Sequence, residues 1–215
     1  MIYEELKIQL DLNEPVDVLK SIGMQTKDND WFVICDKGDC HLFDNNGNEI
    51  DVKKIKSLDE WLIPKYIKKI VVPDSIEYIK EYAFFNCTKL TSINIPDSTK
   101  SIGDNAFFNC INLTSVNIPN LVKSIGDSAF FNCPHLTSIN IPDSVRNIES
   151  WAFGYCINLT SIIIPNLANH IGHHTFNNCK NLKSLTFKGK TIDQVKSMKY
   201  YPWGIKDESI IKYIS

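Results

Sequence analysis

The chain has 215 residues, of which 43% are apolar and 22% are charged, and its 23 basic side chains nearly balance its 25 acidic ones. This composition is typical of a folded protein and excludes disordered, collagen-like and strongly basic chains. No stretch reaches the roughly 18 consecutive apolar residues of a membrane span, so we expect none. Because Glu4, Glu5 and Lys7 place charges in the first segment, we expect no secretory signal and a cytoplasmic location.

Residues 1–65 are predicted to form a small acidic α+β capping domain. They carry 14 acidic and 8 basic side chains, which gives a net charge of −6. A short helix is predicted over residues 15–22, and two strands are predicted over 31–35 and 40–43, on either side of a turn. Residues 57–60 have the form of a capping box, which predicts a second short helix.

A 23-residue repeat organises residues 66–187, where five units follow one another without an insertion. Four kinds of residue keep this interval in every unit. These columns are Pro73, Pro96, Pro119, Pro142 and Pro165; Phe84, Phe107, Phe130, Phe153 and Phe176; Cys87, Cys110, Cys133, Cys156 and Cys179; and Leu90, Leu113, Leu136, Leu159 and Leu182. A unit this short cannot bury its apolar face alone, so successive units must stack and share one core. The sequence therefore predicts a solenoid of five coils.

Each unit contains one short strand of alternating side chains. In the first complete example, Leu90, Ile93 and Ile95 are predicted to face the core, whereas Ser92 and Asn94 face solvent. The proline that follows cannot donate a hydrogen bond to a sheet, and it therefore ends the strand. Stacking of the coils then places these strands in a short parallel sheet with a spacing of about 4.8 Å.

The repeat resembles a known family. Its pattern is Leu-x-x-Ile-x-Ile-Pro-x-Ser-x-x-x-Ile-Gly-x-x-Ala-Phe-x-x-Cys, which residues 90–110 follow throughout, and it is similar to the BspA-like leucine-rich repeats. The resemblance covers about residues 66–187 and implies a leucine-rich repeat solenoid. Members of this family are adhesion and interaction proteins of bacteria, protozoa and some viruses. The resemblance therefore implies host interaction and a location at a surface or in a particle, in contrast to the expected lack of a signal.

Residues 188–215 are predicted to form a helical and aromatic cap at the other end. Residues 191–194 form a capping box, and Ile192, Val195 and Met198 lie on one side of the helix that it starts. The next proline is expected to stop this helix. The apolar residues predicted to cover the last coil are Tyr200, Tyr201, Trp203 and Ile205.

The outward side chains of the strands form a first candidate protein-binding surface, the polar sheet face. It consists of Ser92, Asn94, Ser115, Asn117, Ser138, Asn140, Ser161 and Ile163. Solenoids commonly recognise proteins with a flat polar face of this kind. The alternative is a face that only solvent covers.

Phe85, Phe108 and Phe131 form a second candidate surface, the phenylalanine stripe. The core does not require phenylalanine in this column, because Gly154 and Asn177 occupy it later. Three partly exposed rings would mark an interface with a partner or with a second copy of the chain. Alternatively, the rings lie over neighbouring turns of their own chain.

Cysteine and histidine residues offer less support for chemistry. The cysteine column is predicted to consist of small buried hydrophobes, because every coil keeps the thiol. Cys35 and Cys40 are predicted to be buried hairpin thiols, with a disulfide or a zinc site as alternatives. His170, His173 and His174 occupy surface columns, and we expect no carboxylate to orient their rings. Solvated side chains are favoured over a metal site or a pH-sensing cluster.

The remaining motifs favour binding over catalysis. The chain has no glycine-rich phosphate loop and no nucleophile elbow, so we expect no enzyme activity, no metal and no cofactor. Arg146 is its one arginine, which disfavours nucleic-acid recognition. The sequence predicts a non-catalytic protein–protein interaction module whose partner it does not identify. The alternative is a structural or assembly component, for example of a virus particle, that docks or self-associates through the phenylalanine stripe.

Overall fold

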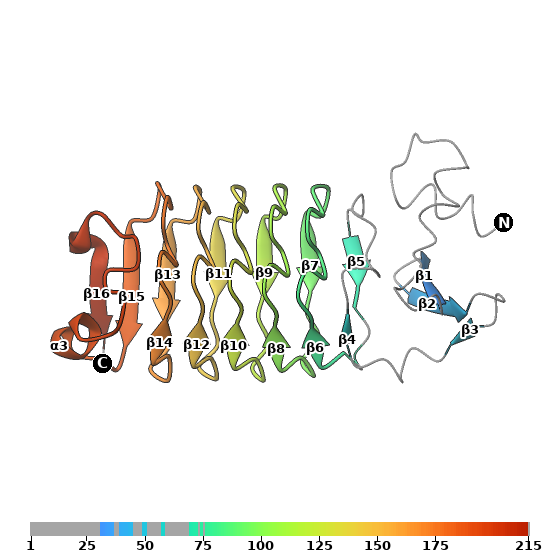
Figure 1. Cartoon of the computed structure of the whole chain (residues 1–215), viewed down its shortest axis with the longest axis horizontal. Helices are drawn as coiled ribbons and strands as arrows, with labels where there is room; N and C mark the ends of the chain where they lie inside the picture. Colours follow the sequence, from blue (N-terminus) through green and yellow to red (C-terminus); the bar gives the residue numbers. More distant parts are fainter. Residues whose placement is uncertain are drawn as a thin grey trace.

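The structure of the chain, a computed structural model, is coiled with a period of 23 residues. The structure describes residues 31–36, 39–44, 49–50, 57–58, 69–72, 74 and 76–214. Successive coils lie side by side along the long axis, from the strands near residue 70 to the C-terminal strand (Figure 1). The helix predicted over residues 15–22 lies outside the described residues.

The predicted strands form one parallel sheet of seven strands along the solenoid. In sequence order they are β5 (Lys69–Val71), β7 (Ser92–Asn94), β9 (Ser115–Asn117), β11 (Ser138–Asn140), β13 (Ser161–Ile164), β15 (Ser184–Lys188) and β16 (Ile211–Ile214). The register keeps the repeat columns together, since Ser138 lies opposite Ser115 and Asn140 lies opposite Asn117. The prediction of a leucine-rich repeat solenoid with a parallel sheet is confirmed.

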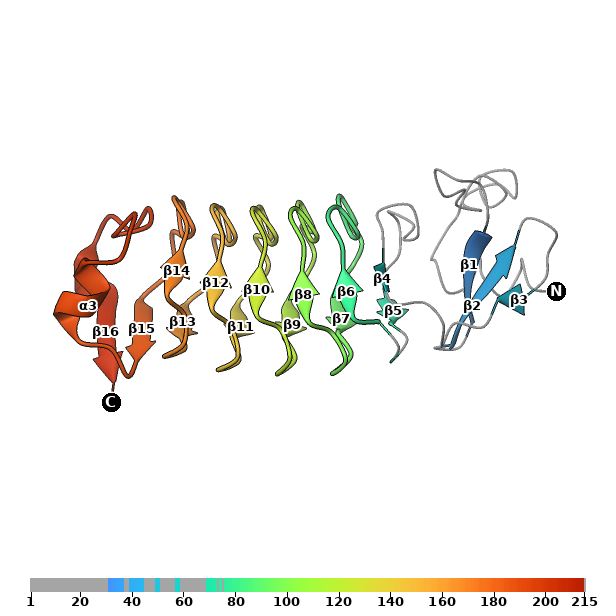
Figure 2. The same cartoon turned by 60° about the horizontal axis from the view of Figure 1, so that its bottom comes forward.

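A second parallel sheet, which the sequence did not predict, runs beside the first (Figure 2). Its two-residue strands are β4 (Ser57–Leu58), β6 (Tyr78–Ile79), β8 (Ser101–Ile102), β10 (Ser124–Ile125), β12 (Asn147–Ile148) and β14 (His170–Ile171). The prediction that Ser57 begins a helix is wrong, because Ser57 and Leu58 pair with β6. Sheet pairing with a distant segment here outweighs a local helix-capping signal.

The core between the two sheets contains one column of stacked phenylalanine rings. The ring centroids of Phe84 and Phe107 lie 4.8 Å apart, and those of Phe107 and Phe130 lie 5.0 Å apart. The column continues through Phe153 to Phe176, and all five rings are buried. Each coil thus buries one aromatic ring against its neighbours, as the repeat predicted.

The first four cysteines of the column are buried beside these rings, which confirms their predicted place, whereas Cys179 is half-buried. The thiols also form hydrogen bonds. The Sγ atom of Cys110 donates to the carbonyl of Phe84 at 3.1 Å, and that of Cys133 donates to Phe107 at 3.2 Å. Burial raises the pKa of both thiols, so they remain protonated and can donate. Because Cys156 and Cys179 form the same bond, four successive coils are each linked to the preceding one by a thiol as well as by their strands.

The two ends of the chain depart from the repeat. Strands β1 (Trp31–Asp36), β2 (Asp39–Asp44) and β3 (Glu49–Ile50) form an antiparallel sheet, which confirms the predicted hairpin. The backbone register of β1 and β2 places Cys35 opposite Cys40.

The C-terminal segment contains the predicted capping box, in which Thr191 caps α3 (Ile192–Lys196). Val195 is buried in this helix, whereas Ile192 is 47% exposed. The helix also ends at Lys196, well before the proline that was expected to stop it. A 3₁₀ turn, η3 (Glu208–Ile210), leads into the unpredicted strand β16.

Candidate functional site

The polar sheet face lies on the outer side of the large sheet, as predicted. In β9 and β11 the serine and asparagine side chains are exposed, and the residue between them is buried. Ile163 takes the asparagine position in β13 and is 45% exposed. Neither its serine and asparagine members nor Ile163 carry charge, so the face is a continuous neutral surface across β7, β9, β11 and β13.

The hydroxyl and amide groups of this face are not used within the described part of the chain. No hydrogen bond of a sheet-face serine or asparagine side chain to another described residue is found. The adjacent threonine column differs, because the hydroxyl of Thr114 donates to the carbonyl of Thr91 at 3.0 Å and that of Thr160 to Thr137 at 3.4 Å. The sheet face therefore presents rows of donors and acceptors that neither the fold nor its neighbours require.

The phenylalanine stripe forms a second, half-buried stack outside the core. Phe85 and Phe108 stack with a centroid distance of 5.1 Å, and Phe108 and Phe131 stack at 5.0 Å. Tyr82 flanks the stripe, because its ring packs edge to face against Phe85 with a centroid distance of 5.5 Å. Because the rings stack face to face along the solenoid, mainly their edges remain accessible.

Two aromatic residues extend this stripe beyond the column in which it begins. The Phe131 ring packs edge to face against Trp151 with a centroid distance of 5.8 Å, and its centroid lies 5.1 Å from that of Tyr155. A Cβ atom on Gly154 would lie 3.0 Å from both the Phe131 and the Trp151 rings, so these rings fill the space of the missing side chain. This extension does not follow from the repeat, because Trp151 lies three residues before the stripe column. The signal was present, since one coil combines a large residue at 151 with glycine at 154.

The row of aromatic side chains then reaches the C-terminal segment through the histidines. The ring centroids of Trp151 and His174 lie 4.6 Å apart, and those of His174 and His173 lie 3.6 Å apart. The centroid distance from His173 to Tyr200 is 5.6 Å. The ammonium group of Lys199 lies 4.6 Å from the centroid of the Tyr200 ring. An aromatic ridge therefore runs from Tyr82 to Tyr200 along most of the solenoid.

An asparagine ladder runs beside the phenylalanine stripe. The side-chain amide of Asn109 donates to Asn86, and that of Asn132 donates to Asn109, both at 2.7 Å. All three residues have positive φ angles, between 53° and 58°, which asparagine adopts more readily than most residues. This ladder explains why the repeat has asparagine before cysteine, and Tyr155 interrupts it.

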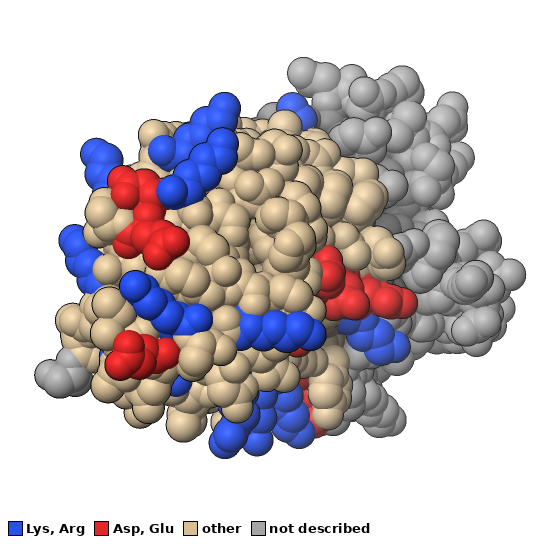
Figure 3. All heavy atoms as spheres, turned by 60° about the vertical axis from the view of Figure 1, so that its left-hand side comes forward, with Lys and Arg blue, Asp and Glu red and all other residues tan. Residues whose placement is uncertain are grey.

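The C-terminal segment is rich in basic side chains. Residues 180–214 hold eight lysines and three acidic residues. Figure 3 shows this C-terminal end, where basic side chains are scattered over a largely uncharged surface together with a few acidic clusters. Lys188 pairs with Asp143 at 3.2 Å.

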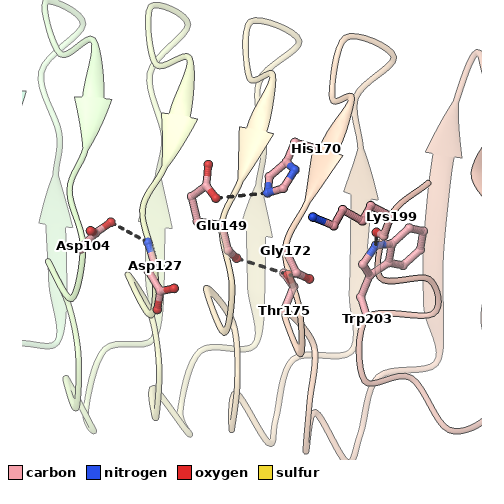
Figure 4. Close-up of polar contacts among 8 residues, drawn as sticks. All are labelled: Asp104, Asp127, Glu149, His170, Gly172, Thr175, Lys199 and Trp203. Atoms are coloured by element: carbon pink, nitrogen blue, oxygen red, sulfur yellow. Dashed lines mark hydrogen bonds and ion pairs between the residues drawn. The ribbon is translucent and has the colours of Figure 1, made fainter.

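The expectation that no carboxylate orients the histidines is wrong for one of them. Nε2 of His170 lies 3.2 Å from Oε2 of Glu149, which belongs to the preceding coil (Figure 4). The same figure shows the hydroxyl of Thr175 donating to the backbone carbonyl of Glu149 at 3.2 Å. The two residues pair because the coils that contain Glu149 and His170 are stacked on each other, although the residues are 21 positions apart in the chain.

The described residues provide little support for metal or membrane chemistry. They contain no group of three or more His, Cys, Asp or Glu side chains placed to hold a metal ion. Within the same part of the chain, no helix has the length and apolar character needed to cross a bilayer. Cys87, Cys110, Cys133, Cys156 and Cys179 are free thiols. For Cys35 and Cys40 the structure describes only the backbone, so the choice between buried thiols, a disulfide and a zinc site stays a prediction.

Comparison with known proteins agrees with this architecture. The model of the BspA type leucine rich repeat region matches residues 64–183 and 101–206, in six copies. No curated protein matches the chain significantly.

Solved structures of bacterial leucine-rich repeat proteins are similar in fold. A leucine rich repeat protein of T. pallidum shares 28% sequence identity with a TM-score of 0.55, over 55% of this chain and 58% of that one. A leucine-rich repeat protein of Bacteroides ovatus shares 23% identity with a TM-score of 0.51, over 74% of this chain and 48% of that one. The chain thus spans about half the length of these relatives. With the six matched repeats and the parallel sheets, these findings show that the chain belongs to the BspA-type leucine-rich repeat family.

Proposed function

We propose that this chain is a non-catalytic module that binds a protein partner through the polar sheet face. Proteins with repeats of this family are typically protein-interaction or adhesion modules, and membership in the family supports this general role. The observation that carries the finer proposal is the contrast between two neighbouring columns: the hydroxyls of Thr114 and Thr160 donate to carbonyls within the solenoid, whereas the serine and asparagine side chains of the face form no such bonds. A partner can therefore bond to these groups without breaking any contact within the chain.

The test uses one substitution on two surfaces. Asn140→Lys places a charge in the middle of the polar sheet face, and Asn169→Lys places the same charge at an exposed position outside it. Lysine is compatible with the second position, because Lys123 occupies the same column two coils earlier. A partner identified by cross-linking and mass spectrometry should lose at least tenfold affinity for the first variant and little for the second.

The aromatic ridge supports self-association as a second candidate function. Tyr82 and Tyr155 are 37% and 40% exposed, respectively, so the ridge offers apolar edges to a second copy. Light scattering over a concentration series, with Phe108→Ser as the variant, separates the two proposals. An oligomer that this variant loses would make the ridge an assembly surface, and a monomer in both cases leaves the polar sheet face as the binding surface.

A further inference from the structure

A cavity of about 330 Å³ lies between the last coil and the segment that leads to β16. Its apolar wall consists of Phe176, Cys179, Leu182, Ile205 and Ile210. This volume is at the lower end of the range of ligand sites, about 300 to 1,000 Å³. The cavity is distinct from the polar sheet face and from the aromatic ridge, and its residues come from the end of the repeat.

The cavity exists because the chain follows the path of one more coil and then leaves it. The N–H of Phe176 donates to the carbonyl of Trp203 at 3.1 Å, as the N–H of Phe153 donates to Thr175 at 3.0 Å one coil earlier. Trp203 and Gly204 then have positive φ angles of 53° and 87°, which turn the backbone away. The remaining part of the coil is absent, and a space opens in its place.

Two backbone groups lose their usual partners at this point. In the two preceding coils, the N–H of Asn132 donates to Gly154 and that of Tyr155 donates to Asn177, both at 2.8 Å. The N–H of Asn178, which is equivalent, has no acceptor among the described residues. The carbonyl of Phe176 likewise accepts no thiol, whereas that of Phe153 accepts the thiol of Cys179 at 3.1 Å.

Apolar groups are also less covered here than in other coils. Leu182 is 7% exposed, whereas the equivalent Leu159 is fully buried. Cys179 is half-buried, unlike the four cysteines that precede it in the column. Burial still raises the pKa of the Cys179 thiol to about 12, so it contributes an uncharged surface at neutral pH. The part of the wall formed by Cys179 and Leu182 is therefore apolar and incompletely packed.

The rim of the cavity carries an excess of positive charge. Lys180 and Lys206 line it, and no carboxylate of the described residues lies within 4.0 Å of either ammonium group. The one acidic residue of the lining, Asp207, accepts a hydrogen bond from the N–H of Ser209 at 3.0 Å. Two ammonium groups and the free N–H of Asn178 thus remain for an acceptor from outside.

We propose that this cavity binds a small molecule with an apolar body and one carboxylate. The body covers the exposed parts of Leu182, Cys179 and Ile205. The carboxylate pairs with Lys180 and Lys206 and accepts a hydrogen bond from Asn178. The occupant is selected by charge as well as by shape, because the rim has a net positive charge and the wall is apolar.

Calorimetry of the full chain with octanoate and octylamine tests this proposal, since the two probes have similar apolar bodies and opposite charges. We expect octanoate to bind more tightly than octylamine by tenfold or more. The variant Lys180→Gln with Lys206→Gln should reduce octanoate affinity at least tenfold. The control variant Lys123→Gln with Lys183→Gln removes two exposed lysines outside the cavity and should leave it unchanged.

The thiol of Cys179 provides a second readout at the cavity itself. Octanoate should slow the alkylation of Cys179 by N-ethylmaleimide, followed by peptide mass spectrometry. Equal affinity for the two probes, equal losses in the two variants, no octanoate binding at millimolar concentration, or an unchanged alkylation rate in the presence of bound octanoate would each overturn the proposal.

Discussion

Single residues of the repeat serve both backbone geometry and contacts between coils. Asn86, Asn109 and Asn132, each of which precedes a cysteine, have positive φ angles, and their amides form the ladder from coil to coil. A residue with a Cβ atom and no hydrogen-bonding side chain pays roughly 1 to 2 kcal/mol in this conformation. The two contributions can be separated by experiment, because glycine tolerates the backbone but cannot form the ladder.

Asn109→Ala should lower the free energy of unfolding by about 1 to 3 kcal/mol, because it removes both the favourable backbone and two ladder contacts. Asn109→Gly keeps the backbone geometry and should retain more of the stability. Urea denaturation of the two variants measures both values. Equal losses would show that the φ angle of this residue contributes nothing measurable.

Cys133→Ser should destabilise the protein by about 1 to 3 kcal/mol, since it places a polar hydroxyl in a fully buried position. The shorter side chain also lies farther from the carbonyl of Phe107, which now accepts the thiol at 3.2 Å. Thermal unfolding followed by circular dichroism tests this expectation. An unchanged melting temperature would mean that the hydroxyl replaces the thiol without loss.

Elements of neighbouring coils are adapted to each other in size. One coil has Ser128 and Phe131, and the next has Trp151 and Gly154 at the same two positions. The rings of Phe131 and Trp151 occupy the space at Gly154, at 3.0 Å from an added Cβ atom. The large residue therefore changes column between these coils while the aromatic ridge remains continuous.

Gly154→Phe and Trp151→Ser should each destabilise the protein by about 1 to 3 kcal/mol, the first by overpacking and the second by uncovering Phe131. The double variant restores the arrangement of the preceding coil and should recover most of the loss. A double-mutant cycle measured in urea should give an interaction energy above about 1 kcal/mol. Asn105→Ser lies two coils earlier in the Trp151 column, and its effect should add to that of Gly154→Phe, which makes this pair the control. Strict additivity of Trp151→Ser and Gly154→Phe would contradict the proposed exchange of size between the two positions.

Features that follow the 23-residue period could be predicted from the sequence, and features that break it could not. The large sheet, the buried phenylalanine and cysteine columns and the two candidate surfaces follow from columns that repeat. The second sheet was missed because strands such as β8 have two residues, too few to show alternation. Likewise, β16 lacks the repeat pattern and is defined only by its pairing with β15.

The candidate contacts were harder to predict than the fold. His170 and Glu149 occupy different columns of adjacent coils, and only the offset between those coils brings them together. The cavity at the last coil depends on the backbone angles of Trp203 and Gly204, for which the repeat provides no template. Such details are set by three-dimensional packing where the period ends.

At the scale of the whole molecule, each coil contacts only its neighbours, so its stability depends on them and on the ends. The C-terminal segment closes the stack through Trp203, which is fully buried and whose Nε1 donates to Lys199 at 3.0 Å. The phenylalanine column inside the stack ends at Phe176, whose N–H donates to the carbonyl of Trp203. Loss of this closing residue should therefore affect the nearest coils most.

Trp203→Ala should cost about 3 to 5 kcal/mol, because it leaves a large void against Phe187 and uncovers the last coil. Since coils are coupled only to their neighbours, the amide protons of β13, β14 and β15 should lose protection first in hydrogen exchange, while those of β7 and β9 keep it. Tyr200→Ala, which changes a side chain that is 40% exposed, should leave both regions protected. Equal loss of protection along the entire solenoid would show instead that the stack unfolds as one cooperative unit, with Trp203 stabilising all coils alike.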